Sequence, residues 1–388
     1  MVRVGVSVAA VTGLVLLPVY FLCHPKSPER RPTPKMHSAP EGLQIIPLED
    51  GWSSMGIAIN DNGDVIGNAF DKQGHVRAFI KRDTKKELLP IPKGASMSTA
   101  TGINDSGAVV GVVGSDEKAR GVLWQGDQPG MLTSGKWDTV AIAVSEDNTV
   151  AGIAVKHSRS ERTGSAWIVR EKVRQNSYKL GIDAVFYTNS PFDFGVWNQA
   201  SAKDFSGMLW KSLGEGKSIG EFAPQASSAE GTLTGVTIQK DKLVPALFKA
   251  GKVAPLAELE GFLGIPMAIN SEESVVGGAM GEGGKVQPLG WADGHIGFLP
   301  VPGDRQGIAL GISNQNTIVG VIEAEDGMAH AAIWKDNKVT DLNDLIDKGS
   351  GWTLIQAHGI NNNEQIVGTA LNGERIATFV FGCRKREP

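Results

Sequence analysis

Short apolar runs separated by tight polar turns recur along this chain and predict β-strands. In each unit a β-branched run ends at a small polar residue, a polar turn follows, and a second run closes on glycine. The pattern is clearest in NDNGDVIG at 60–67 and NDSGAVVG at 104–111. Asn, Asp and Ser bond to their own backbone in turns, so each copy predicts strand, tight turn, strand.

This eight-residue pattern occurs eight times. The steps between closing glycines run from 40 to 48 residues, a period typical of a propeller or a solenoid. The remaining copies are SEDNTVAG (145–152), TNSPFDFG (188–195), SAEGTLTG (228–235), NSEESVVG (270–277), SNQNTIVG (313–320) and NNNEQIVG (361–368).

A third apolar run follows each glycine, as at 166–168 and 207–210, and a weaker fourth often comes next, as at 87–89. Four strands make one propeller blade. The chain is therefore predicted to be all-β, a closed β-propeller of about eight four-stranded blades. Seven blades is the alternative, because the copy at 188–195 has Pro191 in its turn and Asp193 in its second strand.

The two ends of the repeat array predict that the ring closes. The last repeat stops at Phe381, before a fourth strand, while the apolar run 43–48 stands alone before the first repeat. If 43–48 pairs with 378–381, the N-terminal strand completes the last blade and no sheet edge stays open there.

The repeats at 100–111, 309–320 and 357–368, with the third strand at 330–334, are similar to those of the bacterial HAF repeat family of extracellular repeats. The resemblance covers nearly all of 42–383. It implies a repeat β-propeller that is exported from the cell, and it implies little about activity.

Four segments follow from this reading: a hydrophobic anchor helix at 1–23, a flexible linker at 24–41, the propeller at 42–383 and a basic tail at 384–388. Residues 4–23 carry no charge and are long enough to cross a bilayer. We expect a single-pass inner-membrane protein whose propeller faces the periplasm. A cleaved signal with a secreted product, or a lipoprotein anchored at Cys23, are the alternatives.

Charge and cysteine content narrow the class further. The net charge is −4, but both termini are basic, so the propeller itself carries about −9 and is unlike a nucleic-acid binder. The two cysteines, Cys23 and Cys383, lie at opposite ends of the chain and form no disulfide framework.

The sequence offers no linear motif for catalysis. No two histidines have metal-ligand spacing, no C-x-x-C occurs, and no nucleotide loop or G-x-S-x-G is present. We therefore predict no catalytic residue, no metal and no cofactor. His330 and His75, near the start of third strands, are interpreted as structural side chains of the repeat.

Tryptophans outside the repeats are the candidate binding residues. Trp52, Trp137 and Trp352 each lie four or five residues before a small first-strand residue, and Trp197 falls in a loop predicted on the same face. Tryptophan is common at binding hot spots and on carbohydrate-binding surfaces. The alternative is that each one packs between adjacent blades.

These features favour a non-enzymatic, membrane-anchored propeller scaffold in the bacterial cell envelope. It would bind a partner through the loop face that carries the tryptophans. A protein is the expected partner, and a glycan is the alternative. The alternative function is a carbohydrate-binding or carbohydrate-processing propeller with a site at the central channel.

Overall fold

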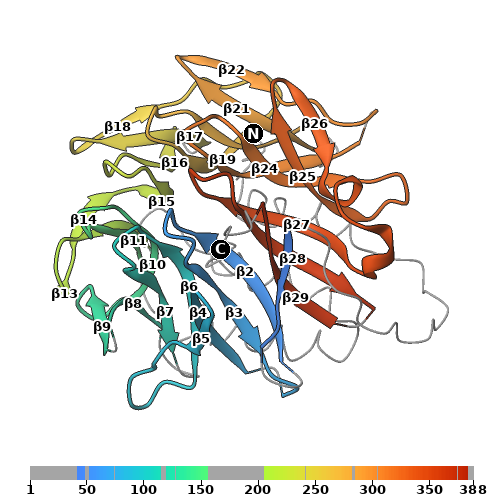
Figure 1. Cartoon of the computed structure of the whole chain (residues 1–388). Coiled ribbons are helices and arrows are strands. Elements are labelled where there is room, and N and C mark those ends of the chain that lie inside the picture. The colour runs from blue at the N-terminus through green and yellow to red at the C-terminus, as the bar shows by residue number, and fades with distance from the viewer. Residues whose placement is uncertain are drawn as a thin grey trace.

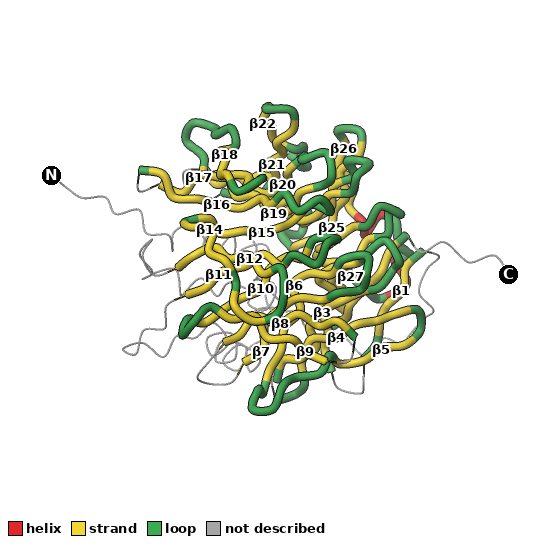
Figure 2. The backbone as a smooth tube through the Cα atoms, turned by 90° about the vertical axis from the view of Figure 1, so that its left-hand side faces the viewer, coloured by secondary structure: helices red, strands yellow, loops and turns green. Residues whose placement is uncertain are grey.

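The computed structural model describes residues 42–48, 52–73, 75–114, 119–126, 128–155, 205–240, 242–281, 285–303, 305–373 and 375–382. These residues form an all-β propeller of seven blades arranged around one axis (Figure 1), which confirms the predicted fold class. The regular structure is strand (Figure 2), apart from the short 3-10 helices η2 (Leu342–Asp344) and η3 (Lys348–Ser350).

We number the blades I to VII in chain order. Blade I consists of β2 (Ser53–Ile59), β3 (Val65–Phe70), β4 (Val76–Arg82) and β5 (Lys85–Leu88), and blade II of β6 (Met97–Ile103), β7 (Val109–Gly114), β8 (Ala119–Gln125) and β9 (Gln128–Thr133). Blade III consists of β10 (Asp138–Val144), β11 (Val150–Val155), β12 (Phe205–Trp210) and β14 (Lys217–Gly220), and blade IV of β15 (Phe222–Ser227), β16 (Leu233–Gln239), β17 (Lys242–Lys249) and β18 (Lys252–Pro255).

The other three blades complete the ring. They are blade V, β19 (Leu263–Ile269), β20 (Val275–Met280), β21 (Val286–Ala292) and β22 (His295–Phe298); blade VI, β23 (Gly307–Ile312), β24 (Ile318–Glu323), β25 (Ala329–Lys335) and β26 (Lys338–Asp341); and blade VII, β27 (Thr353–Ile360), β28 (Ile366–Asn372), β29 (Arg375–Phe381) and β1 (Leu43–Ile46). A further two-residue strand, β13 (Gly214–Glu215), pairs parallel with β9.

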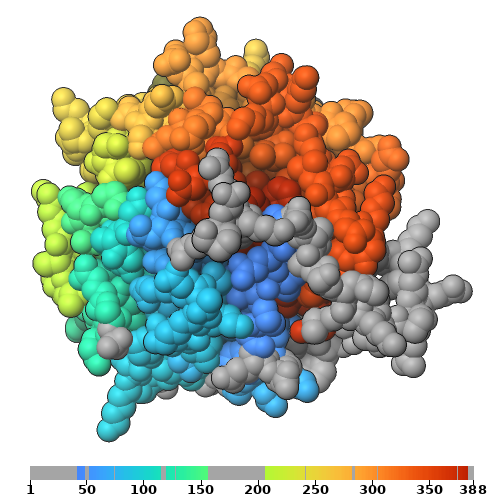
Figure 3. Space-filling view, viewed as in Figure 1, coloured from blue at the N-terminus to red at the C-terminus, as the bar shows by residue number. Residues whose placement is uncertain are grey.

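The first strands of the blades surround the axis. Each contacts the first strands of both neighbouring blades, from β2 through β6, β10, β15, β19 and β23 to β27 and back to β2. The ring is closed by β1, which pairs antiparallel with β29 from Leu43↔Phe381 to Ile46↔Thr378. This confirms the predicted closure, and the blue and red ends of the described chain meet in Figure 3.

Eight blades were the wrong preference, and the seven-bladed alternative is correct. The third strand of blade III is β12 and not the run at 166–168. β12 pairs with β11 from Val150↔Trp210 to Val155↔Phe205. The copy at 188–195 falls between two strands of one sheet and outside the described residues. Pro191, which cannot donate to a ladder, and Asp193 make it the copy least suited to strand pairing.

The closing glycine of every described copy faces a backbone oxygen. A β-carbon on Gly111 would lie 1.9 Å from the oxygen of Thr99, and one on Gly277 would lie 1.9 Å from that of Ile265. A β-bulge in each first strand, such as that between Ala100 and Gly102, accompanies this close approach. The same contact, at 2.0–2.1 Å, occurs at Gly67, Gly152, Gly235, Gly320 and Gly368. The repeated glycine is therefore a packing requirement of the fold.

Buried tryptophans of the third strands fasten four of the seven blades, II, III, V and VI, to the blade before them. Trp124, for example, is 1% exposed, and its Nε1 donates to the backbone oxygen of Pro90 at 2.8 Å. Burying the indole with its N–H satisfied avoids an unpaired polar group. The equivalent bonds join Trp210 to Thr133, Trp291 to Ala257 and Trp334 to Pro300.

The predicted helix at 1–23 lies outside the described residues. Within the part of the chain that the structure describes, no helix is long and apolar enough to cross a membrane.

Candidate binding site at the turn face

The seven described turns between first and second strands share one geometry. In blade I the N–H of Asn60 donates to the oxygen of Asp64 at 3.1 Å, and that of Gly63 donates to the oxygen of Asn60 at 3.0 Å. The same two bonds recur in the other six turns. Because the turns join the strands nearest the axis, they form one end of the propeller. We call this end the turn face.

The fourth residue of every turn has a left-handed backbone, with φ between +58° and +85°. Gly63, Gly107, Asn148 and Gly231 are residue types that tolerate this conformation. Glutamate disfavours it, yet Glu273 and Glu364 occupy the same place in blades V and VII.

Interblade hydrogen bonds hold these two glutamates in place. Glu364 accepts from Lys335 at 3.0 Å and from Ser313 and Thr317 at 2.9 and 2.8 Å, all in the preceding blade. Burial opposes ionisation, but these bonds outweigh it and lower the pKa of Glu364. Glu273 is held likewise by Lys249 and Thr232 of blade IV. The bonds offset the cost of a left-handed non-glycine residue.

The first residue of the turn ties neighbouring blades when it is asparagine. Nδ2 of Asn60 donates to the backbone oxygen of Asn104 at 3.0 Å, and Nδ2 of Asn104 donates to that of Ser145 at 2.9 Å. Asn270 and Asn361 make the same bond, to Ser313 and Asn60. A serine side chain is too short to make it.

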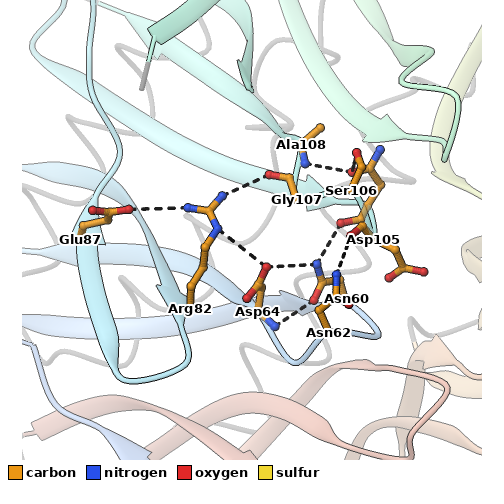
Figure 4. A network of polar contacts seen from close by, with 10 residues as sticks. Asn60, Asn62, Asp64, Arg82, Glu87, Asp105, Ser106, Gly107 and Ala108 are labelled. Atoms are coloured by element: carbon orange, nitrogen blue, oxygen red, sulfur yellow. Dashed lines mark hydrogen bonds and ion pairs between the residues drawn. The ribbon is translucent and has the colours of Figure 1, made fainter. Parts of the chain in front are cut away.

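The second residue of the turn makes a further interblade bond at six of the seven junctions. The N–H of Asp61 donates to Oδ1 of Asp105 at 2.8 Å, and that of Asp105 donates to Oε1 of Glu146 at 3.0 Å. Figure 4 shows this junction of blades I and II, where Arg82 also bonds to the oxygen of Gly107. The other bonds run from Glu146 to Ala229, Ser271 to Asn314, Asn314 to Asn362 and Asn362 to Asp61.

The turns themselves are acidic, and basic residues of the third strands, Arg82, Lys249 and Lys335, pair with three of their carboxylates. The first five residues of the seven described copies include no lysine or arginine. Burial, together with the negative charges of Asp105 and Asp61, raises the pKa of Glu146. These three carboxylates therefore lie near enough to repel one another, which favours a positively charged ligand. The acidic residues of the turns are Asp61, Asp64, Asp105, Glu146, Asp147, Glu230, Glu272, Glu273 and Glu364.

The bulges place one extra residue in each of six first strands beside the axis and two in β27. Most of these eight residues are apolar, and His358 is the only ionisable one among Ile57, Thr101, Ile142, Gln225, Met267, Leu310, Ile355 and His358. Its Nε2 is buried and has no hydrogen-bond partner within the described chain. Burial lowers the pKa of His358 to about 4, so the ring is neutral at pH 7.

Two histidine–aspartate pairs lie away from the turn face. Nδ1 of His330 is 2.5 Å from Oδ2 of Asp341, and Nδ1 of His75 is 2.6 Å from Oδ2 of Asp71. Burial opposes protonation of His330, but Asp341 outweighs it and raises the pKa. Among the described residues no serine or cysteine hydrogen-bonds to either imidazole. Neither pair is part of a nucleophilic triad there.

Asp341 and Asp347 act as helix caps. The Asp341 carboxylate accepts from the N–H of Asn343 at the start of η2, and the Asp347 carboxylate accepts from that of Gly349 at the start of η3. In the part of the chain that the structure describes, no group of three His, Cys, Asp or Glu side chains is placed to hold a metal ion.

Of the four predicted tryptophans, Trp137 and Trp352 lie in different parts of the ring. Trp137 is half-buried against an apolar cluster of blades II and III, and Trp352 against another cluster in blades VI and VII. Trp52 is half-buried just before β2, and Trp197 lies outside the described residues. A binding role for them stays a prediction. The turn face is at the other end of the first strands. Its interblade bonds were not predicted from the sequence.

A scan against family models found no match, and no curated protein matches the sequence. The HAF resemblance therefore stays a prediction. Solved structures are similar to this chain at the level of fold. Acylaminoacyl peptidase of Pyrococcus horikoshii matches with a TM-score of 0.52 and 13% identity, over 85% of this chain and 51% of that one.

Two other peptidase structures match over similar lengths. One, from a study of two prolyl endopeptidases, has a TM-score of 0.51 and 9% identity, over 86% of this chain and 51% of that one. The other, a puromycin-hydrolyzing peptidase of Mycobacterium tuberculosis, has a TM-score of 0.47 and 10% identity, over 86% and 54%. This chain spans about half the length of these proteins.

These findings contradict the predicted function. The chain was expected to be a non-enzymatic, membrane-anchored scaffold, yet the propellers it matches belong to hydrolases. At these identities the likeness itself establishes a propeller fold and nothing finer.

Proposed function

We propose that this chain is the peptide-binding propeller of a peptide hydrolase and that it holds peptide segments at its turn face. The observation that carries the proposal is the acidic ring of turns at the end of the axis, with Asp61, Asp105 and Glu146 in consecutive blades. A concave or annular surface of one charge attracts ligands of the other. Peptides with basic side chains or a free amino terminus have that charge.

The likeness to acylaminoacyl and prolyl peptidases supports the choice of peptides as ligands. The chain spans about half of those proteins, and the two histidine–aspartate pairs of the described propeller have no nucleophile. The catalytic group is therefore assigned to residues outside the described propeller or to a second polypeptide. In this arrangement the propeller binds and orients the peptide, which raises the effective concentration of the scissile bond.

Two measurements test the proposal with the purified full-length chain. In the first, fluorescein-labelled peptides are titrated with the protein, and amide hydrogen exchange is compared with and without peptide. Saturable binding with slower exchange in the seven turns is expected. Glu146→Gln keeps an oxygen for the N–H of Asp105 but removes a charge, so it should weaken binding. Glu325→Gln, in the loop between β24 and β25, is the control.

The second measurement concerns hydrolysis. A peptide mixture is incubated with the chain alone, with an extract of source cells lacking the chain, and with both together. Mass spectrometry should show cleavage products that depend on adding the chain. Absence of peptide binding, or a product pattern that is unchanged by the chain, would overturn the proposal.

A further inference from the structure

The junction between the turns of blades IV and V differs from the other six. Each of those is tied by the N–H of its second turn residue, which donates to the second residue of the next turn. Among the described residues, the N–H of Ala229 in blade IV makes no such bond. The junction is held instead by Glu273, whose Oε1 accepts from Oγ1 of Thr232 at 2.9 Å and pairs with the Lys249 ammonium group of blade IV.

The sequence explains the missing tie. In five of the other six junctions the acceptor is the side chain of Asp, Asn or Glu at the second position of the next turn, as at Asp105, Glu146 and Asn314. Blade V has Ser271 there, and its hydroxyl group extends less far. Ser228, at the first position of blade IV, is likewise too short to replace the asparagine tie.

A groove of about 510 Å³ lies at this junction. A volume of this size suits a small ligand or a few residues of a peptide. The groove is lined by Glu230, Gly231, Thr232, Lys249, Ala250, Ser271, Glu272 and Glu273.

The charges in the groove are only partly paired. Glu273 lies 2.5 Å from the Lys249 ammonium group, and Oε2 of Glu272 accepts from Asn316 at 3.2 Å. Glu230 is exposed and has no hydrogen bond or ion pair with another described residue. Three carboxylates against one ammonium group leave a charge of −2. A negative charge of this size attracts a cationic ligand, and a lysine or arginine side chain has that charge.

We infer that the groove between blades IV and V binds a basic peptide segment. A lysine or arginine side chain lies between Glu230 and Glu272, and a backbone oxygen of the peptide accepts from the N–H of Ala229. The peptide thus supplies the acceptor that Ser271 cannot. Carboxylates pair well with guanidinium groups, and charged hydrogen bonds are the stronger ones. The inference rests on the proposed function for the statement that the ligand is a peptide. It adds that the peptide is basic and that it binds between blades IV and V.

Fluorescence anisotropy tests the ligand with two labelled peptides that differ at one position. One has a single arginine among alanine, glycine and serine residues, and the other has citrulline, which is neutral and of nearly the same shape. The arginine peptide should bind at least about tenfold more tightly, as expected for one charged hydrogen-bonded contact. Equal affinities would overturn the inference but leave the proposed function standing, whereas binding of neither peptide would overturn both.

Variants then test the place. The double variant Glu230→Gln with Glu272→Gln should lose most of the preference for arginine, while Glu260→Gln, an exposed carboxylate outside the groove, should change affinity less than about twofold. If Glu260→Gln weakens binding as much as the double variant, the attraction is diffuse and the groove is not the site.

A further variant separates loss of the site from loss of the fold. Ser271→Asn should supply the missing acceptor to Ala229, as Asn314 and Asn362 do in their own junctions. We expect it to close the groove and abolish binding of the arginine peptide, with a melting temperature equal to or above that of the unchanged protein. Full binding by a stable Ser271→Asn protein would contradict the assignment of Ala229.

Discussion

Nδ2 of Asn361 donates a hydrogen bond of 2.8 Å to the backbone oxygen of Asn60, which precedes it by 301 positions in the chain. Both residues are buried, at 4% and 5% exposure. The bond joins the last turn to the first on the inner side of the ring, while β1 and β29 join the same two ends on the outer side. The junction that closes the ring is therefore stabilised both near the axis and at the outer edge of blade VII.

Replacing Asn361 by alanine should destabilise the protein by about 2–4 kcal/mol, because several buried backbone groups lose their partners. Asn363→Ala, which removes an exposed bond from the same turn to Asp61, should cost less than about 1 kcal/mol. Urea unfolding measures both. Equal losses would show that burial of the tie does not matter.

Gly277→Ala should destabilise the protein by about 2–4 kcal/mol, since its β-carbon would overlap the backbone oxygen of Ile265 and force the bulge to move. Gly297→Ala in β22, where nothing lies within 4 Å of the added carbon, is the control and should change stability by less than about 1 kcal/mol. Thermal unfolding of the two variants decides. A tolerated Gly277→Ala would contradict the packing argument.

His358 should make the fold sensitive to mild acid. Its pKa is about 4 in the folded protein and about 6.5 in an unfolded chain, so the unfolded state binds the proton first as pH falls. Stability present above pH 6.5 should be lost towards pH 4, by up to about 1.4 kcal/mol per pH unit from this residue.

Urea unfolding of the unchanged protein and of His358→Gln at pH 7, 6 and 5 measures this contribution. The free energy of unfolding should fall more steeply with acid in the unchanged protein than in the variant. Parallel pH dependences would rule out a buried, neutral imidazole at this position.

Trp137→Ala and Trp352→Ala should each lower the free energy of unfolding by about 2–4 kcal/mol, because both indoles pack against interblade apolar clusters. Calorimetry of the two variants measures the loss. Melting transitions unchanged from that of the unchanged protein would instead support the binding role predicted for these residues.

Much of the architecture is present in local sequence. Alternating β-branched runs and turn residues are properties of single hairpins, so they predict strands such as β7 and β20 without knowledge of their neighbours. The closure by 43–48 was predictable too, because only one blade lacked a fourth strand. Blade number was harder: the run at 166–168 resembles a third strand as closely as 207–210 does, and only pairing with β11 distinguishes them.

The turn face could not be read in the same way. Its bonds join residues about 40 positions apart, such as Asn104 and Ser145, and depend on which turns become neighbours around the axis. Glu273 and Glu364 occupy left-handed positions that their residue type disfavours, and only contacts with the preceding blade explain them. The missing bond of Ala229, next to the groove between blades IV and V, is visible only as an exception to bonds that the other blades make.

The pairing of β1 with β29 also sets a schedule for folding. During synthesis the segment 43–46 is made before every other described strand, yet its strand partner at 378–381 is the last of them to be made. Blades I to VI can each form as soon as their own strands exist, whereas the closing blade must wait for β29. Until then β1 has no strand partner and blade I lacks its contacts with blade VII, and that is the stage at which a molecular chaperone would be of most use.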